Sequence, residues 1–226
     1  MIFIDPKLWQ VASGTPIGNV DVGDIIQLRE NLVPVDYIVV HQGLPSSMYD
    51  ASCDGTWLLR KDIAENRVWD SGNSNVLESS DIQSYLNNTW INRYDTDIRN
   101  AIKQVKIPYR QNGGSGGTDR NGANGLSCKI FLLSGYELGW TKSKNPYFPQ
   151  DGAKLDYFTD GSGSAANKKR IAKYNGSATE WWTRSPYAGN SNNVWFVNPN
   201  GGYGILDGAI TYGVRPAFVL PSDFLI

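Results

Sequence analysis

Residues 181–218 read WWTRSPYAGNSNNVWFVNPNGGYGILDGAITYGVRPAF, and this stretch decides the fold of the chain. Its two ends, residues 181–186 and 213–218, are apolar and aromatic, which is typical of strands, or the edges of strands, in a packed sheet. Between them, residues 187–213 are rich in Asn, Gly, Ser and Tyr, with two short apolar runs and Asp207 as the only charge. The stretch therefore predicts a rigid frame around a neutral, turn-rich segment.

The residue types of this middle segment are those found in adaptable binding loops. Tyr supplies a rigid amphipathic ring, while Ser, Gly and Asn supply turns and hydrogen bonds. The same composition also fits a meander of short strands joined by ordinary turns. Composition alone does not separate these two interpretations.

The absence of four residue types favours the binding interpretation. Lys, Glu, Gln and Met occur 25 times in the 226 residues, so about three would be expected in the segment 187–213. None is present. An Asn codon changed at its two adenines can yield Asn, Ser, Tyr, Asp, Gly, Ile, Thr or Ala, but none of these four and never Trp. The absence fits mutagenesis directed at adenines, although the tail after Gly213 also lacks all four.

Several motifs together carry a resemblance to a known family. WWTRSP at 181–186, the Asn/Gly/Tyr-rich segment after it and YGVRPAFVLP at 212–221 resemble the C-terminal end of formylglycine-generating-enzyme-type C-type lectin domains. The pattern is most similar to those domains that serve as variable proteins of diversity-generating retroelements in phages and gut bacteria. SCKIFLLSGYELG at 127–139 and KKRIAKYNGSATEWW at 168–182 are similar to the same phage-associated group.

This resemblance implies a fold and an organisation of the chain. We expect an α+β protein with a C-type lectin-like fold, in which small twisted antiparallel sheets, two flanking helices and long irregular loops form one domain over residues 1–226. The resemblance is most specific over 181–220, which it makes the variable, ligand-binding end. Residues 1–60 carry less of it, and we expect residues 1–21 to form an arm or an edge strand.

The expected ligand contacts come from the variable end of the chain. Strand alternation assigns ten side chains to the ligand-facing surface. They are Tyr187, Asn190, Ser191, Asn192, Asn193, Asn198, Asn200, Tyr203, Asp207 and Tyr212. The apolar residues Val194, Phe196, Ile205, Val214 and Phe218 are expected to hold them in place.

Five further residues are assigned to the scaffold: Trp181, Trp182, Arg184, Trp195 and Arg215. Trp195 cannot arise from an Asn codon by adenine changes, so we expect a fixed position. Arg184 and Arg215 lie in apolar flanks, and a buried arginine must be paired and fully hydrogen-bonded. We expect these two to bind loop carbonyls or an aspartate beneath the variable surface.

The rest of the chain predicts ordinary secondary structure. β-branched and alternating residues indicate strands over 22–28, 35–40 and 57–60. Ser79-Ser80-Asp81 is a capping signal for a helix that reaches about Thr89. A second helix, capped by Asp95 or Thr96, is expected to carry Ile98, Ile102 and Val105 on one stripe and to end before Pro108.

A glycine-rich segment interrupts this pattern. Residues 111–125 hold six glycines and almost nothing apolar, which predicts a mobile loop because such a composition buries too little surface to offset its ordering entropy. The segment lacks the GxxxxGK[ST] pattern of a phosphate-binding loop. After it we expect a buried strand over 128–133 and a short helical turn capped by Ser134.

Charge and cysteine content limit the classes of partner. The net charge is −1, so no global field attracts nucleic acid. Cys53 and Cys128 have no second Cys or His at metal-ligand spacing, and we expect two reduced thiols. Asn198-Pro199-Asn200 resembles the carbonyl-ligand tripeptide of calcium-dependent lectins but lacks its acidic member. We expect no metal and no cofactor.

The sequence also bears on location and partners. MIFIDPKLWQ has neither a basic region nor a sustained apolar core, and no apolar run approaches 18 residues. We therefore expect synthesis in the host cytoplasm without a signal peptide, no membrane insertion, and a place on a virion, in the phage tail or on its surface. Other virion proteins and a cell-surface protein or glycan of a host bacterium are the expected partners.

Three functions compete at this point. The first is a non-enzymatic, receptor-binding display protein, and the second is a structural virion component whose loops bind nothing. The third is an enzyme of the formylglycine-generating type. That chemistry uses a reactive thiol pair in the C-terminal part of the fold, whereas this chain has no cysteine after Cys128. It has one histidine, His41. We therefore expect no catalytic residue.

Overall fold

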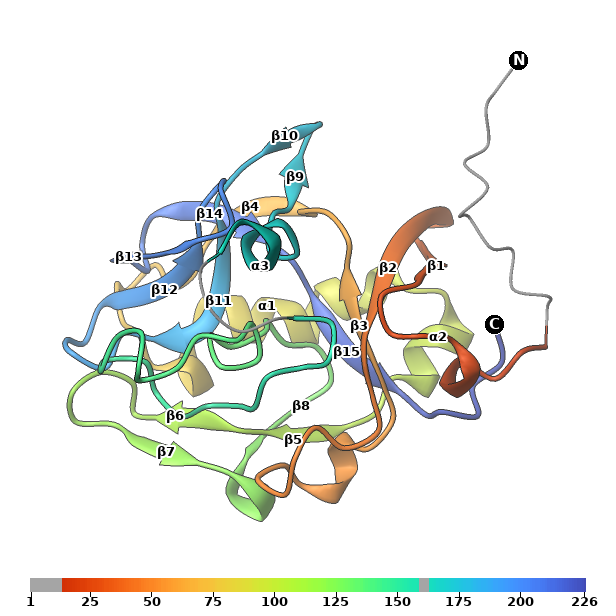
Figure 1. Ribbon diagram of the computed structural model, residues 1–226, viewed down its shortest axis with the longest axis horizontal. Coiled ribbons are helices and arrows are strands. Elements are labelled where there is room, and N and C mark those ends of the chain that lie inside the picture. The colour runs from red at the N-terminus through yellow and green to blue at the C-terminus, as the bar shows by residue number, and fades with distance from the viewer. Residues whose placement is uncertain (1–13, 159–162) are drawn as a thin grey trace.

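Two sheets organise the computed structural model, which describes residues 14–158 and 163–226 (Figure 1). The four-stranded sheet has the order β1 (Ile25–Glu30), β2 (Val33–Gln42), β3 (Thr56–Arg60) and β15 (Ala217–Leu220). The five-stranded sheet has the order β13 (Tyr203–Asp207), β12 (Asn193–Val197), β11 (Trp181–Pro186), β14 (Thr211–Val214) and β4 (Glu65–Val68). Every strand pair in the two sheets is antiparallel except β11 with β14.

Smaller elements complete the described chain. Three two-stranded ribbons pair β5 (Val105–Ile107) with β8 (Leu126–Cys128), β6 (Tyr109–Gln111) with β7 (Thr118–Arg120), and β9 (Lys173–Tyr174) with β10 (Ser177–Ala178). The α-helices are α1 (Asp81–Asn88), α2 (Thr96–Ala101) and α3 (Ser164–Lys168). Short 3-10 turns are η1 (Ile17–Asn19), η2 (Ala51–Cys53), η3 (Leu77–Ser79), η4 (Trp90–Arg93) and η5 (Gly122–Asn124). The α+β class predicted from the sequence is confirmed.

The two sheets are joined by two chain crossings that lie side by side. One crossing leads from β3 to β4 and the other from β14 to β15, and β3 pairs with β15 while β4 pairs with β14. Arg215 lies in the second crossing with 1% of its surface exposed. Its Nε donates to the carbonyl of Arg60 at 2.8 Å and its Nη2 to that of Lys61 at 2.9 Å. The guanidinium thus binds one crossing to the other.

The central strand β11 separates two hydrophobic cores. All six of its residues are buried, and successive side chains of a strand point to opposite faces. Trp182 therefore packs in one core with α1, α2 and β1, while Trp181 packs in the other with Trp57 and Phe131. Because both faces of β11 are covered, the frame around residues 187–213 is rigid on both sides.

The first predicted helix and the first three predicted strands are confirmed. Helix α1 begins after Ser80, whose Oγ accepts a hydrogen bond from the Gln83 amide at 3.3 Å. The second helix is shorter than predicted, since α2 ends at Ala101 and Val105 lies in β5. The Lys103 amide donates to the Val219 carbonyl at 2.9 Å. Pairing with the sheets therefore overrides the helical spacing of the apolar residues.

The segment 111–125, predicted to be a mobile loop, is held in place by hydrogen bonds. Gln111 and residues 118–120 belong to the ribbon β6–β7, in which Gln111 lies opposite Thr118, and η5 follows at residues 122–124. Arg110 closes the ribbon, because its Nη1 donates to Asp119 Oδ1 at 2.8 Å and its Nε to the Gly114 carbonyl at 2.8 Å. Hydrogen bonds to one arginine supply the order that apolar burial does not. The strand predicted over 128–133 is also wrong beyond its first residue, since β8 ends at Cys128 and Phe131 forms only an isolated bridge with Ala217.

The two ends of the described chain lie together. Of the segment 1–21, residues 1–13 lie outside the described residues, and Ile17 is fully buried. The Ile17 amide donates to the Phe224 carbonyl at 2.8 Å and the Gly18 amide to that of Ser222 at 2.8 Å. In residues 14–158 and 163–226, no helix has the length and apolar character needed to cross a membrane.

Candidate binding surface at the C-terminal end

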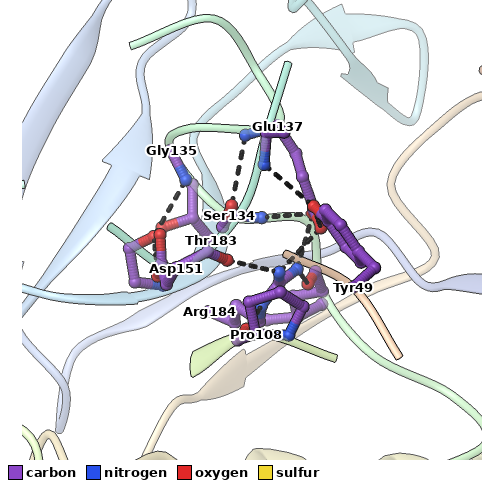
Figure 2. A network of polar contacts seen from close by, with 11 residues as sticks. Tyr49, Pro108, Ser134, Gly135, Glu137, Asp151, Thr183 and Arg184 are labelled. Carbon is purple, nitrogen blue, oxygen red and sulfur yellow. Dashed lines mark hydrogen bonds and ion pairs between the residues drawn. The ribbon is translucent and has the colours of Figure 1, made fainter. Parts of the chain in front are cut away.

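A buried ion pair joins β11, the strand that leads into the C-terminal loops, to the turn that begins at Ser134 (Figure 2). Arg184 on β11 and Glu137 are both fully buried. Arg184 Nη1 donates to Glu137 Oε2 at 2.5 Å, and Nη2 donates to Oε1 at 2.7 Å. Burial alone would lower the pKa of Arg184, but the Glu137 carboxylate raises it above its ordinary value. Arg184 therefore stays protonated, and its contact with Glu137 is bidentate.

The other hydrogen-bonding groups of this pair bind the surrounding chain. Arg184 also donates to the carbonyls of Leu132 at 2.9 Å, Asp151 at 2.7 Å and Pro108 at 3.2 Å, so all five guanidinium N–H groups are used. Glu137 accepts from Tyr49 Oη at 2.8 Å and from the Ser134 amide at 2.9 Å. One ion pair therefore fixes several segments that are distant in sequence.

Ser134 and Glu137 also cap each other. Ser134 Oγ accepts from the Glu137 amide at 3.1 Å, while Glu137 Oε2 accepts from the Ser134 amide, which is a capping box. The short turn predicted after Ser134 is confirmed by a hydrogen bond from the Leu138 amide to the Ser134 carbonyl at 3.1 Å.

Asp151 is a second buried carboxyl group in this network. Its Oδ2 accepts from Ser185 Oγ at 2.6 Å, and Ser185 Oγ accepts from the Gly135 amide at 2.8 Å (Figure 2). Asp151 Oδ1 has no hydrogen-bond partner within the described ranges. Burial raises the pKa of Asp151 to about 7, against the opposing effect of Arg184.

Asn75 holds the loop 187–193 through its main chain. This fully buried side chain donates from Nδ2 to the carbonyls of Asn193 at 2.8 Å, Asn190 at 3.0 Å and Tyr187 at 3.3 Å. The Asn75 amide also donates to the Ser191 carbonyl at 2.9 Å. Every one of these contacts is made to a carbonyl oxygen, so none depends on the identity of a loop side chain.

The turn of the β6–β7 ribbon contacts Asn75 from the other side. Asn75 Oδ1 accepts from the Gly114 amide at 2.8 Å. A Cβ added to Gly113 would lie 2.4 Å from Asn75 Oδ1, and one added to Gly114 would lie 2.4 Å from the Asn190 carbonyl oxygen. Both glycines also have positive φ angles, of 58° and 22°. Only glycine permits this approach of two backbones.

The structure brings six of the ten assigned residues together at one end of the β12–β13 hairpin. The group consists of Tyr187, Asn190, Ser191, Asn192, Asn193 and Asp207. Asn190 Oδ1 accepts from the amides of Asn192 at 3.2 Å and Asn193 at 2.9 Å, and Asn192 Nδ2 donates to Asp207 Oδ1 at 2.7 Å. Ser191 is exposed. Some of these polar side chains therefore shape the loop itself.

Three more assigned residues lie at the other end of the hairpin. Asn200 is exposed, and its Oδ1 accepts from the Gly202 amide at 3.0 Å in the turn after β12. Asn198 Nδ2 donates to the Tyr203 carbonyl at 3.4 Å. The Tyr203 ring packs edge-on against Trp195, with ring centroids 5.5 Å apart.

Tyr212 lies on the opposite face of the five-stranded sheet. Its ring centroid is 4.9 Å from that of Trp182 and 4.8 Å from that of Phe196. Phe196 follows Trp195 on β12, so the two rings face opposite sides. All ten assigned residues are at least partly exposed. Tyr212, however, does not share a face of the sheet with Tyr187 and Tyr203.

A residue that sequence reasoning did not single out joins the same surface. Tyr147 is 44% exposed, and its ring centroid is 4.8 Å from that of Tyr187. The Ala188 amide donates to the Tyr147 carbonyl at 3.1 Å. We call Tyr147, Tyr187, Trp195 and Tyr203 the aromatic row. The aromatic pair inside Pro146-Tyr147-Phe148-Pro149 was the available sequence signal.

The two cysteine thiols are in environments that suppress their nucleophilic reactivity. Cys53 and Cys128 are buried free thiols, and burial raises the pKa of Cys53 to about 11 and that of Cys128 to about 12. Both thiols are therefore protonated at neutral pH. Within residues 14–158 and 163–226, no cluster of three or more His, Cys, Asp or Glu side chains is arranged to hold a metal ion.

Removing one partner of the buried pair should destabilise the protein. Glu137→Gln leaves the Arg184 charge buried without its counter-ion, and we expect a loss of about 3–5 kcal/mol in the free energy of unfolding. Urea denaturation measures this loss. As a control, Lys61→Ala removes a partly exposed pair with Asp36 (Nζ to Oδ2, 2.9 Å) and should cost about 0–1 kcal/mol. Equal losses in the two variants would contradict this account.

Asp151 should make stability depend on pH. The folded protein binds the Asp151 proton with a pKa of about 7, against an ordinary value of 3.8. Its contribution is fully present below about pH 4 and is lost as pH rises toward 7, by up to about 1.4 kcal/mol per pH unit. Asp151→Asn keeps an acceptor for Ser185. The free energy of unfolding of this variant, measured by denaturation at several pH values, should vary less between pH 5 and pH 7 than that of the parent. Parallel curves for the two proteins would rule out the proposed titration.

Comparison with known proteins places the chain in a family. Residues 54–222 match the model of the family described as "Domain of unknown function (DUF6273)". No curated protein and no solved structure matched. The matched range includes Asn75, Glu137 and Arg184, and it runs from two residues before β3 to two residues after β15. Because it covers about three quarters of the 226 residues, the chain belongs to the DUF6273 domain family.

Proposed function

We propose that this protein is a non-enzymatic display protein that binds a ligand through its C-terminal loops, and that these loops are diversified by a retroelement. One observation carries the proposal. Asn75 donates hydrogen bonds to four main-chain carbonyls of the loop 187–193 and to no side chain of that loop. A loop held in this way keeps its course when side chains such as Ser191 change.

The C-type lectin-like fold is part of the same proposal. It is supported by the two small sheets, by the helices that pack on one core and by the long irregular segments. The position of the loops at the C-terminal hairpin supports it as well (Figure 1). The buried Arg184 beneath these loops supports the scaffold role assigned to the WWTRSP motif.

The contacts of each side chain indicate where variation is tolerated. Ser191 is exposed, so a change there costs little. Asn190 accepts two loop amides through Oδ1, and Asp or Ser, both reachable from an Asn codon by adenine changes, also provide an oxygen acceptor. The Asn192–Asp207 contact ties two positions together, so single changes at either are less tolerated.

The three tyrosines of the aromatic row supply the contact area of the proposed surface, and the buried Trp195 packs against Tyr187 and Tyr203. Partly exposed tyrosines offer a large apolar ring with a polar tip, which is why they are frequent at binding surfaces. We propose a cell-surface protein or glycan of a host bacterium as the ligand. The protein would be carried on a virion, in the tail or on the surface, in contact with other virion proteins.

A structural virion component remains the second candidate. The observation that favours it is the internal pairing of Asn190, Asn192 and Asp207, which accounts for these polar residues without a ligand. The two functions differ in whether Tyr187, Ser191 and Tyr147 contact another molecule.

Binding to host cells or a surface-glycan array should separate the two. We expect Tyr187→Ala to reduce binding at least about tenfold, while Ser191→Ala changes it less and Ser177→Ala, an exposed serine on β10, does not change it. In denaturant titrations, the free energies of unfolding of all three variants should lie within about 1 kcal/mol of that of the parent. Unchanged binding in Tyr187→Ala and Tyr147→Ala would reject the proposed surface.

A further inference from the structure

A pocket that includes none of the ten assigned residues lies between β7 and three other segments of the chain. Its volume is about 470 Å³, which is within the range of small-ligand sites. The side chains that give it its chemistry are Ser46, Met48, Asp119, Asn121, Tyr136 and Gln150. They come from four separate parts of the chain.

The floor of this pocket is fixed by the buried ion-pair network. Gly152 lines the pocket, and a Cβ added there would lie 2.6 Å from Ser134 Oγ and 2.9 Å from Tyr49 Oη. The Ala153 amide donates to Tyr49 Oη at 3.0 Å. Tyr49 in turn donates to Glu137. The main chain of the floor therefore rests directly on the most rigid part of the molecule, so the pocket is largely preformed.

The carboxylate that lines the pocket, Asp119, is already paired with basic side chains. Asp119 Oδ1 accepts from Arg110 Nη1 at 2.8 Å, and Oδ2 accepts from the Gln150 amide at 3.0 Å. Lys142 Nζ lies 3.7 Å from the same Oδ2. A metal cation would compete with these two basic side chains for the carboxylate, and an anionic ligand would have to displace the carboxylate from them. The pocket therefore selects a neutral ligand.

Unused amide groups line the opening. Asn121 and Gln150 are exposed, and their side-chain amides make no hydrogen bond to the described part of the protein. Tyr136 is half-buried, and its hydroxyl accepts from the Lys142 amide at 3.2 Å, which fixes the ring. Amides donate and accept hydrogen bonds, and the ring and Met48 add apolar surface.

We propose that this pocket binds a neutral saccharide unit. Sugar hydroxyls both donate and accept, which matches the two amides and the remaining acceptor capacity of Asp119. The C–H face of a pyranose ring is apolar and carries partial positive charge, which matches the negative face of the Tyr136 ring. The pocket is a second binding site, and it does not depend on the function proposed for the C-terminal loops.

The test uses the full chain and four defined probes. The methyl glycosides of glucose, galactose, mannose and N-acetylglucosamine are titrated in turn, and binding is followed by amide chemical shifts. We expect at least one of them to bind with a Kd on the order of millimolar, the weak end of the affinity scale. The double variant Asn121→Ala/Gln150→Ala should weaken that binding roughly tenfold, since two hydrogen bonds are lost.

Matched variants identify the site. Tyr136→Phe keeps the ring and should bind like the parent, whereas Tyr136→Ala should lose binding. Tyr187→Ala and Ser191→Ala, which alter the C-terminal loops, should bind these glycosides unchanged, so failure of one proposal is distinct from failure of the other. The inference is overturned if none of the four glycosides binds the parent at about 10 mM, above the expected Kd. It is equally overturned if the double variant binds as the parent does.

Discussion

The bidentate ion pair between Arg184 and Glu137 is the interaction on which the rest of the structure depends. Taking two charges out of water costs several kcal/mol each, and only near-complete hydrogen bonding repays this. Here the carboxylate takes four donors and the guanidinium five acceptors, supplied by segments between Tyr49 and Asp151. The pair is therefore formed only when these segments are all in place, which gives a chain with short strands a single arrangement.

The two surfaces proposed to bind ligands lie above this network in different ways. The C-terminal loop 187–193 follows directly from β11, the strand that carries Arg184, and Asn75 fixes its main chain. The pocket near Gly152 rests on Tyr49 and Ser134, which are bonded to Glu137. In both cases a fixed backbone presents the side chains of the proposed surface, and this lowers the entropic cost of binding.

Local sequence patterns predicted local structure well. The Ser80 cap, the three N-terminal strands and the turn at Ser134 follow from neighbours within four residues, and each is confirmed. The burial of Arg184 and its contacts with loop carbonyls also agree with its apolar context.

Long-range contacts could not be predicted from the same patterns. Glu137 is 47 residues from Arg184, and Asn75 is 115 residues from Asn190; in the sequence Asn75 looks like one more turn residue. The ribbon β6–β7 was missed because its order comes from Arg110 rather than from apolar burial. Val105 was placed on a helix because pairing with β8 is invisible to helical periodicity.

Hydrogen exchange at the loop 187–193 tests the central claim most directly. The Tyr187 amide donates to the Asn193 carbonyl at 2.8 Å, and the Ala188 amide to that of Tyr147. If the main chain is held independently of loop side chains, Ser191→Tyr should leave the protection of these amides as in the parent, while Asn75→Ala should lower it strongly. Loss of protection in Ser191→Tyr, or its retention in Asn75→Ala, would contradict the account.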